Sequence, residues 1–276
     1  MEQAAELVPT GPSTLAIGGN SLHRTPLSFV HALARRGNAK LHIVKTAGAY
    51  DIDVLCLAGL VEAVSAGFVG YETQFGLARH YRRAVETGRV EAREHACYTV
   101  ITSLRASVYG MSFLPVRGLD GSDLVAARGF ARVENPYDHS DTAVAIPAIT
   151  PDVAVIHVQY ADPFGNGVIM GPKYEDVVMA RAAKKVILIT ERMVGHGQLP
   201  VPMDHVDVPS VLVDALVEAP GGAWPGSCYG EYDLDEAAVQ RVIDMQSGEE
   251  LQEYLAELDR LGSRSGGTSS AEGASP

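Results

Sequence analysis

One stretch near the start of the chain, residues 13–26, constrains the fold more than any other. Residues 13–17 are short and apolar, as a buried parallel strand would be. Gly18-Gly19 follows, and residues without a Cβ let another molecule approach the backbone closely. Pro26 suits the first turn of a helix, and Thr25 precedes it at the position of an N-cap. Because ligands of open α/β sheets bind where such a strand meets its helix, we expect a binding site here.

Short apolar strands and helices alternate along the rest of the chain. Strands are predicted at residues 41–44, 69–71, 90–94, 153–158, 185–190 and 211–217, and helices at 60–65, 75–87, 98–108 and 174–183. Strands separated by helical segments favour an α/β fold, with an open and mostly parallel sheet that carries helices on both faces.

The chain reads as one α/β domain over residues 1–262. A C-terminal helical extension is predicted at about 235–261, where apolar residues recur at helical spacing. Residues 263–276 are mostly Gly, Ser, Ala and Pro, and such a segment cannot bury apolar area. We therefore predict a disordered tail there.

Charge and cysteine usage exclude several classes of protein. The net charge of −12 argues against a nucleic-acid partner, because phosphate contacts need a basic surface. No run approaches about 20 apolar residues, so no membrane span is expected. The N-terminus is acidic and does not resemble a signal peptide. Cys56, Cys97 and Cys228 lie far apart, which favours reduced thiols and a cytoplasmic location.

Familiar catalytic motifs are missing from the sequence. It contains neither GxGxxG nor GxxxxGK[ST], and its nine histidines form no HExxH, so neither a nucleotide loop nor a metal site is expected. Residues 226–230, Gly-Ser-Cys-Tyr-Gly, have the shape of a nucleophile elbow with Cys228 in the serine position. They follow a Pro/Gly-rich loop and not a strand, so a structural cysteine is the favoured interpretation.

Three polar stretches are weaker candidates. Residues 162–167, Asp-Pro-Phe-Gly-Asn-Gly, follow the strand at 153–158, and a plain turn with Asp and Asn bonded to their own backbone explains them. Residues 117–123 read as a loop, with a possible ligand contact. Glu72 precedes the helix predicted from residue 75, where a glutamate favours the helix dipole.

Taken together, these stretches resemble the α (A) subunit of family I CoA-transferases, the group that includes glutaconate CoA-transferase. The α signature is Gly-Gly-Phe, three residues, Gly, any residue, Pro; residues 18–26 match its frame, with Asn20 in place of Phe and Arg24 in place of the third Gly. The further matches are residues 113–115 with 121–123, residues 151–157, Ala161-Asp162 with Gly165-Asn166, and residues 213–223 with Cys228-Tyr229-Gly230 and Tyr232. The resemblance covers roughly residues 12–260.

This resemblance implies a Rossmann-like fold and the transfer of coenzyme A from an acyl-CoA to a carboxylic acid. In that family the thioester is attacked by a glutamate in a Ser-Glu-Asn-Gly motif of the β subunit, and the reaction passes through an anhydride and a glutamyl-CoA thioester. Here Glu134-Asn135 is followed by Pro136, so the nucleophile is expected on a separate β subunit. The resemblance thus implies a heterodimer or heterotetramer, a CoA thioester as substrate and no permanently bound cofactor.

The residues predicted to bind substrate or CoA are Gly18, Gly19, Asn20, Arg24, Ser122, Asp123, Asp162, Gly165 and Asn166. Backbone amides at residues 18–20 could stabilise the oxyanion that forms when a thioester is attacked. The guanidinium of Arg24 could hold a carboxylate bidentately, which leads to the hypothesis of an acidic substrate.

Two alternatives stay open. Relatives of this α chain include CoA-thioester ring hydrolases of bacterial steroid degradation, which use an α-chain glutamate as base. We expect that acid directly after residues 91–94, but His95-Ala96-Cys97-Tyr98 holds no carboxylate, which favours the transferase. Glu72 could serve as a substitute base if its pKa were raised. A non-catalytic α/β binding subunit is the other alternative.

Overall fold

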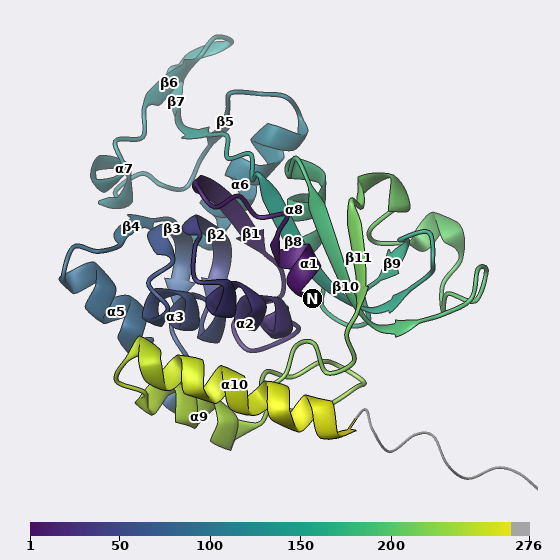
Figure 1. Ribbon diagram of the computed structural model, residues 1–276. Helices are drawn as coiled ribbons and strands as arrows, with labels where there is room; N and C mark the ends of the chain where they lie inside the picture. Colours follow the sequence, from purple (N-terminus) through teal and green to yellow (C-terminus); the bar gives the residue numbers. More distant parts are fainter. Residues whose placement is uncertain (266–276) are drawn as a thin grey trace, which may run out of the picture.

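The computed structural model describes residues 1–265, and its centre is a parallel sheet of seven strands in the order β11-β10-β8-β1-β2-β3-β4 (Figure 1). The strands are β1 (Pro12–Ile17), β2 (Lys40–Gly48), β3 (Val61–Val69), β4 (Glu91–Glu94), β8 (Val153–Ala161), β10 (Val186–Met193) and β11 (Ala215–Glu218). A short strand, β9 (Gly167–Val168), pairs antiparallel with β8. The predicted open α/β sheet is confirmed.

Helices cover both faces of this sheet, as predicted. One face carries α2 (Leu27–Arg36) and α3 (Tyr50–Leu57), with α1 (Glu2–Ala5), α5 (Arg79–Glu86), α9 (Glu236–Asp244) and α10 (Gly248–Ser265) around them. The other face carries α6 (Cys97–Val108) and α8 (Asp176–Ala182). Successive side chains of β1 serve both layers, because a strand alternates its faces: Leu15 and Ile17 join the first core and Ala16 the second.

Strand β1 lies where the strand order reverses. From β1 the chain adds β2, β3 and β4 on one side, and later β8, β10 and β11 on the other. Ligands of open α/β sheets bind beyond the carboxyl ends of the strands at such a switch point. The topology therefore draws attention to the residues that follow β1, in agreement with the expectation from the sequence.

A small second sheet was not predicted. Its strands β5 (Phe113–Val116), β6 (Arg132–Asn135) and β7 (Asp138–Pro147) pair antiparallel in the order β5-β7-β6, next to the short helix α7 (Leu124–Ala127). It has its own small core, formed by Val116, Leu119, Phe130, Val144 and Ile146. The β6–β7 hairpin projects away from the main sheet (Figure 1).

Several predicted elements were wrong in type or extent. Residues 60–65, predicted as a helix, belong largely to β3, because pairing with β2 on one side and β4 on the other outweighs their helix-compatible composition. The predicted helix 75–87 is split into α4 (Glu72–Phe75) and α5. Residues 211 and 212 lie in a 3₁₀ turn (Ser210–Leu212) and residue 213 follows it, so 211–213 are not a strand. Another 3₁₀ turn spans Met203–His205. Thr25 does not cap α2, which begins after Pro26 with no side-chain cap.

Helices α9 and α10 occupy the segment where C-terminal helices were predicted. Leu251, Tyr254 and Leu255 of α10 are buried in the larger core, so this segment packs on the domain itself. Helix α10 runs to Ser265, and the remainder of the predicted disordered tail lies outside the described residues. Within residues 1–265, no helix combines the length and apolar character needed to cross a bilayer.

Candidate active site

A cavity of about 400 Å³ opens beyond the carboxyl ends of β1 and β3. Three segments that are far apart in the sequence build its wall. They contribute Asn20, Ser21, Leu22 and His23 after β1, Tyr71, Glu72, Thr73 and Gln74 after β3, and Tyr174, Ser227 and Leu234 from later loops. We call this cavity the open pocket. In the described part of the chain, this lining holds one carboxylate, that of Glu72, and neither lysine nor arginine.

Backbone strain is concentrated around the open pocket. Among residues 1–265, four residues other than glycine have a left-handed backbone: Ser21 (φ 47°), Arg24 (φ 53°), Glu72 (φ 58°) and Tyr174 (φ 46°). Three of them line the pocket and the fourth follows His23 in the sequence. Side chains rarely adopt this conformation, and it persists where the surrounding structure enforces it, often at functional sites. This strain marks the pocket as the candidate site.

His23 and Ser227 face each other in the pocket wall. The Nδ1 atom of His23 lies 3.0 Å from Ser227 Oγ. Two backbone hydrogen bonds hold the segments together, from Arg24 N to Ser227 O at 2.7 Å and from Ser227 N to Leu22 O at 2.8 Å. Burial, and then the charge of Arg24, lower the pKa of His23 below its usual range, so the ring is neutral near pH 7.

Glu72 reaches the pocket from the other side. Its backbone is strained and its side chain is exposed. Ser21 Oγ lies 3.5 Å from Glu72 Oε1. The carboxylate is therefore accessible to a ligand in the open pocket, and an accessory role of Glu72 stays a prediction.

Arg24 does not face the open pocket, and the prediction that it holds a substrate carboxylate was wrong. The side chain is fully buried and forms an ion pair with Asp176. It also donates from Nη1 to His157 O at 2.7 Å and from Nη2 to Pro172 O at 3.0 Å. Because the side chain is fully buried and its two terminal nitrogens are bonded to these partners, the guanidinium does not reach a ligand in the open pocket.

The glycine amides are also occupied, which corrects the expected oxyanion site. Gly18 N donates to Val155 O at 2.9 Å, and Gly19 N donates to Asp176 Oδ1 at 2.7 Å. A Cβ on Gly18 would lie 2.2 Å from Asp176 Oδ1, so the glycine is required by the close approach of this carboxylate. Of residues 18–20, Asn20 alone lines the open pocket.

A second buried ion pair supports the loop that follows β1. Lys45 Nζ lies 2.8 Å from Asp51 Oδ2, and both side chains are fully buried. Lys45 also donates to Gly18 O at 3.1 Å and to Thr25 Oγ1 at 3.0 Å. We call Arg24–Asp176 and Lys45–Asp51 the buried ion pairs. Together they fix the path of the loop that leaves β1.

The remaining predicted site residues lie elsewhere. Ser122 and Asp123 are exposed at the start of α7, beside the second sheet. Asp162 accepts hydrogen bonds from the backbone of Phe164 and from Asn166, and Gly165 lies in the same turn. The turn interpretation explains this stretch, since its polar groups bond one another. None of these residues lines the open pocket.

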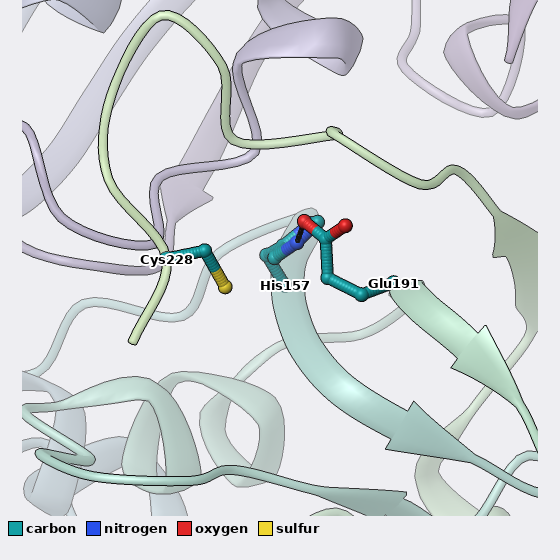
Figure 2. A group of neighbouring side chains, drawn as sticks. All are labelled: His157, Glu191 and Cys228. Atoms are coloured by element: carbon teal, nitrogen blue, oxygen red, sulfur yellow. Dashed lines mark hydrogen bonds and ion pairs between the residues drawn. The ribbon is translucent and has the colours of Figure 1, made fainter. Parts of the chain in front are cut away.

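A buried cluster of His157, Glu191 and Cys228 supports the loop that carries Ser227 (Figure 2). His157 Nε2 lies 2.7 Å from Glu191 Oε1, and Glu191 Oε2 accepts from Gly221 N at 2.6 Å. Burial raises the pKa of Glu191, but hydrogen bonds from His157 and from Tyr232 outweigh it and lower the pKa overall. The carboxylate thus stays charged and ties the loop to β8 and β10.

The thiol of Cys228 is not a nucleophile in this setting. Burial, followed by the charge of Glu191, raises its pKa to about 12. The structural interpretation of this cysteine is therefore supported by its surroundings. Although donor atoms of His157, Glu191 and Cys228 lie within 4.8 Å of one another, the hydrogen bond between His157 and Glu191 already occupies two of them. The cluster acts as a hydrogen-bonded support.

Sequence reasoning missed His23, Tyr174 and Ser227 as pocket residues. They come from three loops separated by more than fifty residues each. No spacing rule links such positions, because only the packing of the loops beyond the sheet brings them together. The signal in the sequence that could have pointed to His23 is the run of polar residues between the glycine pair and Pro26.

Comparison with known proteins agrees with the fold and places the chain among enzymes of CoA thioesters. The family model for coenzyme A transferase matches residues 1–219. The chain is 30% identical to the α-type polypeptide of glutaconate CoA-transferase from Acidaminococcus fermentans over 249 residues, which cover 84% of this chain and 78% of that protein. It is 33% identical to the IpdA polypeptide of the cholesterol ring-cleaving hydrolase from Mycobacterium tuberculosis over 244 residues, covering 85% and 83%.

A solved structure shows the same similarity in three dimensions. A variant of the decarboxylase AibA/AibB superposes with a TM-score of 0.84 at 30% identity, over 94% of this chain and 96% of that chain. A transferase, a hydrolase and a decarboxylase are thus named among these similar proteins. The chain belongs to the coenzyme A transferase family and is homologous to its α subunits.

Proposed function

We propose that this chain is the α subunit of a heteromeric CoA-transferase, and that the open pocket is its half of the active site. The observation that carries the proposal is the strained, polar pocket beyond β1, on a chain of this family. Side-chain amides of Asn20 and Gln74 line it and can donate to a developing oxyanion, in place of the occupied glycine amides.

The attacking carboxylate is proposed to come from a β subunit. The chain holds no Ser-Glu-Asn-Gly motif, and Glu72 is the one carboxylate that lines the pocket in the described structure. A stable complex of this kind usually buries about 1,600 Å² or more. The free state of Cys56, Cys97 and Cys228 fits the proposed cytoplasmic location.

The acceptor is proposed to be a carboxylic acid, as the reaction requires. Arg24 no longer supports the hypothesis that the substrate carries a second acidic group, because its side chain is buried and paired with Asp176. Among the described residues, no lysine or arginine lines the pocket. A second carboxylate would therefore need a cation from the β subunit.

Co-expression with the product of the adjacent gene tests the proposal. We expect a stable complex that exchanges CoA between an acyl-CoA and a free acid in a screen of mono- and dicarboxylates. Replacing the glutamate of the partner's Ser-Glu-Asn-Gly motif by glutamine should abolish the exchange. A partner without that glutamate, or a complex without exchange, would contradict the transferase assignment.

A ring-cleaving hydrolase that acts on CoA thioesters is the second candidate, because Glu72 lines the pocket and the chain is 33% identical to the IpdA subunit of a cholesterol ring-cleaving hydrolase. In that case Glu72 would activate a water molecule. Glu72→Gln would then abolish turnover while acyl-CoA still binds. In the transferase, the same change should lower the rate but leave the glutamyl-CoA intermediate on the partner detectable.

A further inference from the structure

We propose that Ser227 and His23 form a nucleophile–base pair that cleaves acyl-CoA thioesters through an acyl-serine on this chain. The inference rests on the proposed function in one respect: an acyl-CoA binds in the open pocket. The proposed cleavage differs from the CoA-transferase reaction in its nucleophile. The nucleophile here is Ser227 of this chain, so no glutamate from a partner is needed.

The geometry that carries the proposal is the contact between the two side chains. Ser227 Oγ and His23 Nδ1 are 3.0 Å apart, within the range of a nucleophile and its general base. Both residues line the open pocket, so a bound thioester can reach the hydroxyl. Ser227 is partly exposed, unlike its neighbour Cys228, which is buried.

The pair is also held rigidly. The segments 22–24 and 227 are joined by two backbone hydrogen bonds, which fix the serine against the histidine. Behind them, the cluster of His157 and Glu191 secures the loop from Gly221 onward. Positioning of this kind lowers the entropic cost of bringing reacting groups together.

The protonation state of His23 suits a base. Burial and Arg24 lower the pKa of the ring and keep it neutral near pH 7, and in the tautomer that is protonated at Nε2 the Nδ1 atom can accept the serine proton. The other nitrogen, Nε2, is buried and has no hydrogen-bond partner in the described structure. Because no carboxylate orients it, we expect a slower reaction than that of a complete triad.

The proposed reaction balances with water as co-reactant. Ser227 Oγ attacks the thioester carbonyl, and its proton moves to His23 Nδ1. The C–S bond breaks, the proton passes to the CoA sulfur, and an acyl-serine ester remains. His23 Nδ1 then takes a proton from water as the water oxygen attacks the ester carbonyl. The C–O bond to Ser227 breaks, the proton passes from His23 to Ser227 Oγ, and the free acid leaves. Asn20 and Gln74 are placed to stabilise the two oxyanions.

The test uses the full chain alone with acetyl-CoA, and measures free CoA by chromatography and the protein by intact mass. We expect CoA release above the buffer rate and a transient gain of one acetyl group on the peptide that contains Ser227. Ser227→Ala and His23→Gln should each reduce CoA release by about 100-fold. Ser107→Ala is the matched control, since its hydroxyl bonds Thr150 Oγ1 at 2.7 Å outside the pocket lining.

Further variants separate the outcomes. Ser227→Cys should restore a trapped acetyl adduct, which shows that the site is folded and that position 227 is acylated. An adduct on Cys97, unchanged CoA release in Ser227→Ala, or no release above buffer would overturn the proposal. The proposal would also be overturned if Glu72→Gln abolished CoA release while Ser227→Ala left CoA release unchanged. CoA exchange by the complex with its partner is scored separately, so failure of either proposal is distinguishable.

Discussion

The loop that leaves β1 sends neighbouring side chains into two different environments. Arg24 turns inward and joins the buried ion pairs, whereas His23, one residue earlier, lines the open pocket. Inside, the charges of both pairs have partners at bonding distance. Outside, the polar groups of the pocket are neutral or, as in Glu72, unpaired with any cation of the pocket lining.

This difference separates the groups that hold the site from the groups that can do chemistry. A buried ion pair whose charges compensate each other lies out of reach of a ligand, but it fixes the backbone around it. The pocket residues keep free capacity and are strained, which is typical of functional positions. Arg24, the charged side chain of the loop after β1, therefore has a structural role.

The largest expected effect comes from breaking one buried ion pair. Asp176→Asn removes the countercharge of Arg24 and should lower the free energy of unfolding by about 3–5 kcal/mol, because it leaves a buried cation uncompensated. Urea denaturation measures it. The surface change Asp244→Asn, at an exposed pair with Arg79, should cost no more than about 1 kcal/mol.

A double variant sharpens this result. Arg24→Met combined with Asp176→Asn removes both charges and keeps an oxygen for Gly19 N. It should be more stable than Asp176→Asn alone. If the double variant were the less stable of the two, Arg24 would contribute through its bonds to His157 O and Pro172 O more than through charge.

The next effect tests the close approach of Asp176 to the glycine turn. Gly18→Ala would place its Cβ 2.2 Å from Asp176 Oδ1 and 3.2 Å from Val155 O, so overpacking should cost about 1–3 kcal/mol. Gly11→Ala is the control, since nothing lies within 4 Å of the new methyl group and its φ is not positive. Equal stability of the two variants in thermal unfolding would contradict the packing.

Acid should lower the stability of the fold through histidines that lie outside the open pocket. Burial, and then Arg35, lower the pKa of His31 to about 3, against about 6.5 in the unfolded chain. Below pH of about 6.5 the unfolded chain binds a proton that the folded chain does not, so stability falls as the pH falls. The expected loss is about 2 kcal/mol between neutrality and about pH 5.

Urea denaturation at a series of pH values measures that slope. Burial also lowers the pKa of His42 and of His95 to about 4, so they act in the same direction. His31→Gln should flatten the slope more than His23→Gln does, because His23 lies on the open side and is about half buried. If His23→Gln flattened the slope more than His31→Gln, the assignment of His31 to the interior and of His23 to the open pocket would be contradicted.

The smallest effect is a gain in stability on the open side. Glu72→Gly should relieve the left-handed backbone at φ 58° and raise the free energy of unfolding by about 1 kcal/mol, after the entropic cost of glycine is subtracted. Activity should fall at the same time, since the pocket loses its acid. Glu86→Gly within α5 should instead destabilise by about 1 kcal/mol. A stabilised and fully active Glu72→Gly would separate the strain from function.

Much of the fold could be predicted because its signals are local. The apolar strands near residues 13–17, 153–158 and 185–190 and the helices between them follow from composition and periodicity. Strand β3 was missed because its Val-Glu-Ala-Val-Ser-Ala start suits a helix as well, and only its neighbours in the sheet decide. The second sheet consists of short strands whose pairing is equally non-local.

The sequence by itself determined that residues 14–26 form a strand and a glycine turn that lead into a helix, and it placed the candidate site beyond them. The tertiary structure alone decided which residues of that turn face inward. The reason is that Asp176 and Ser227 reach this turn from positions more than 150 residues away. Asp176 claims Arg24 and the amide of Gly19, and Ser227 meets His23, so contacts made by distant chain segments assign one side chain to stability and its neighbour to the pocket.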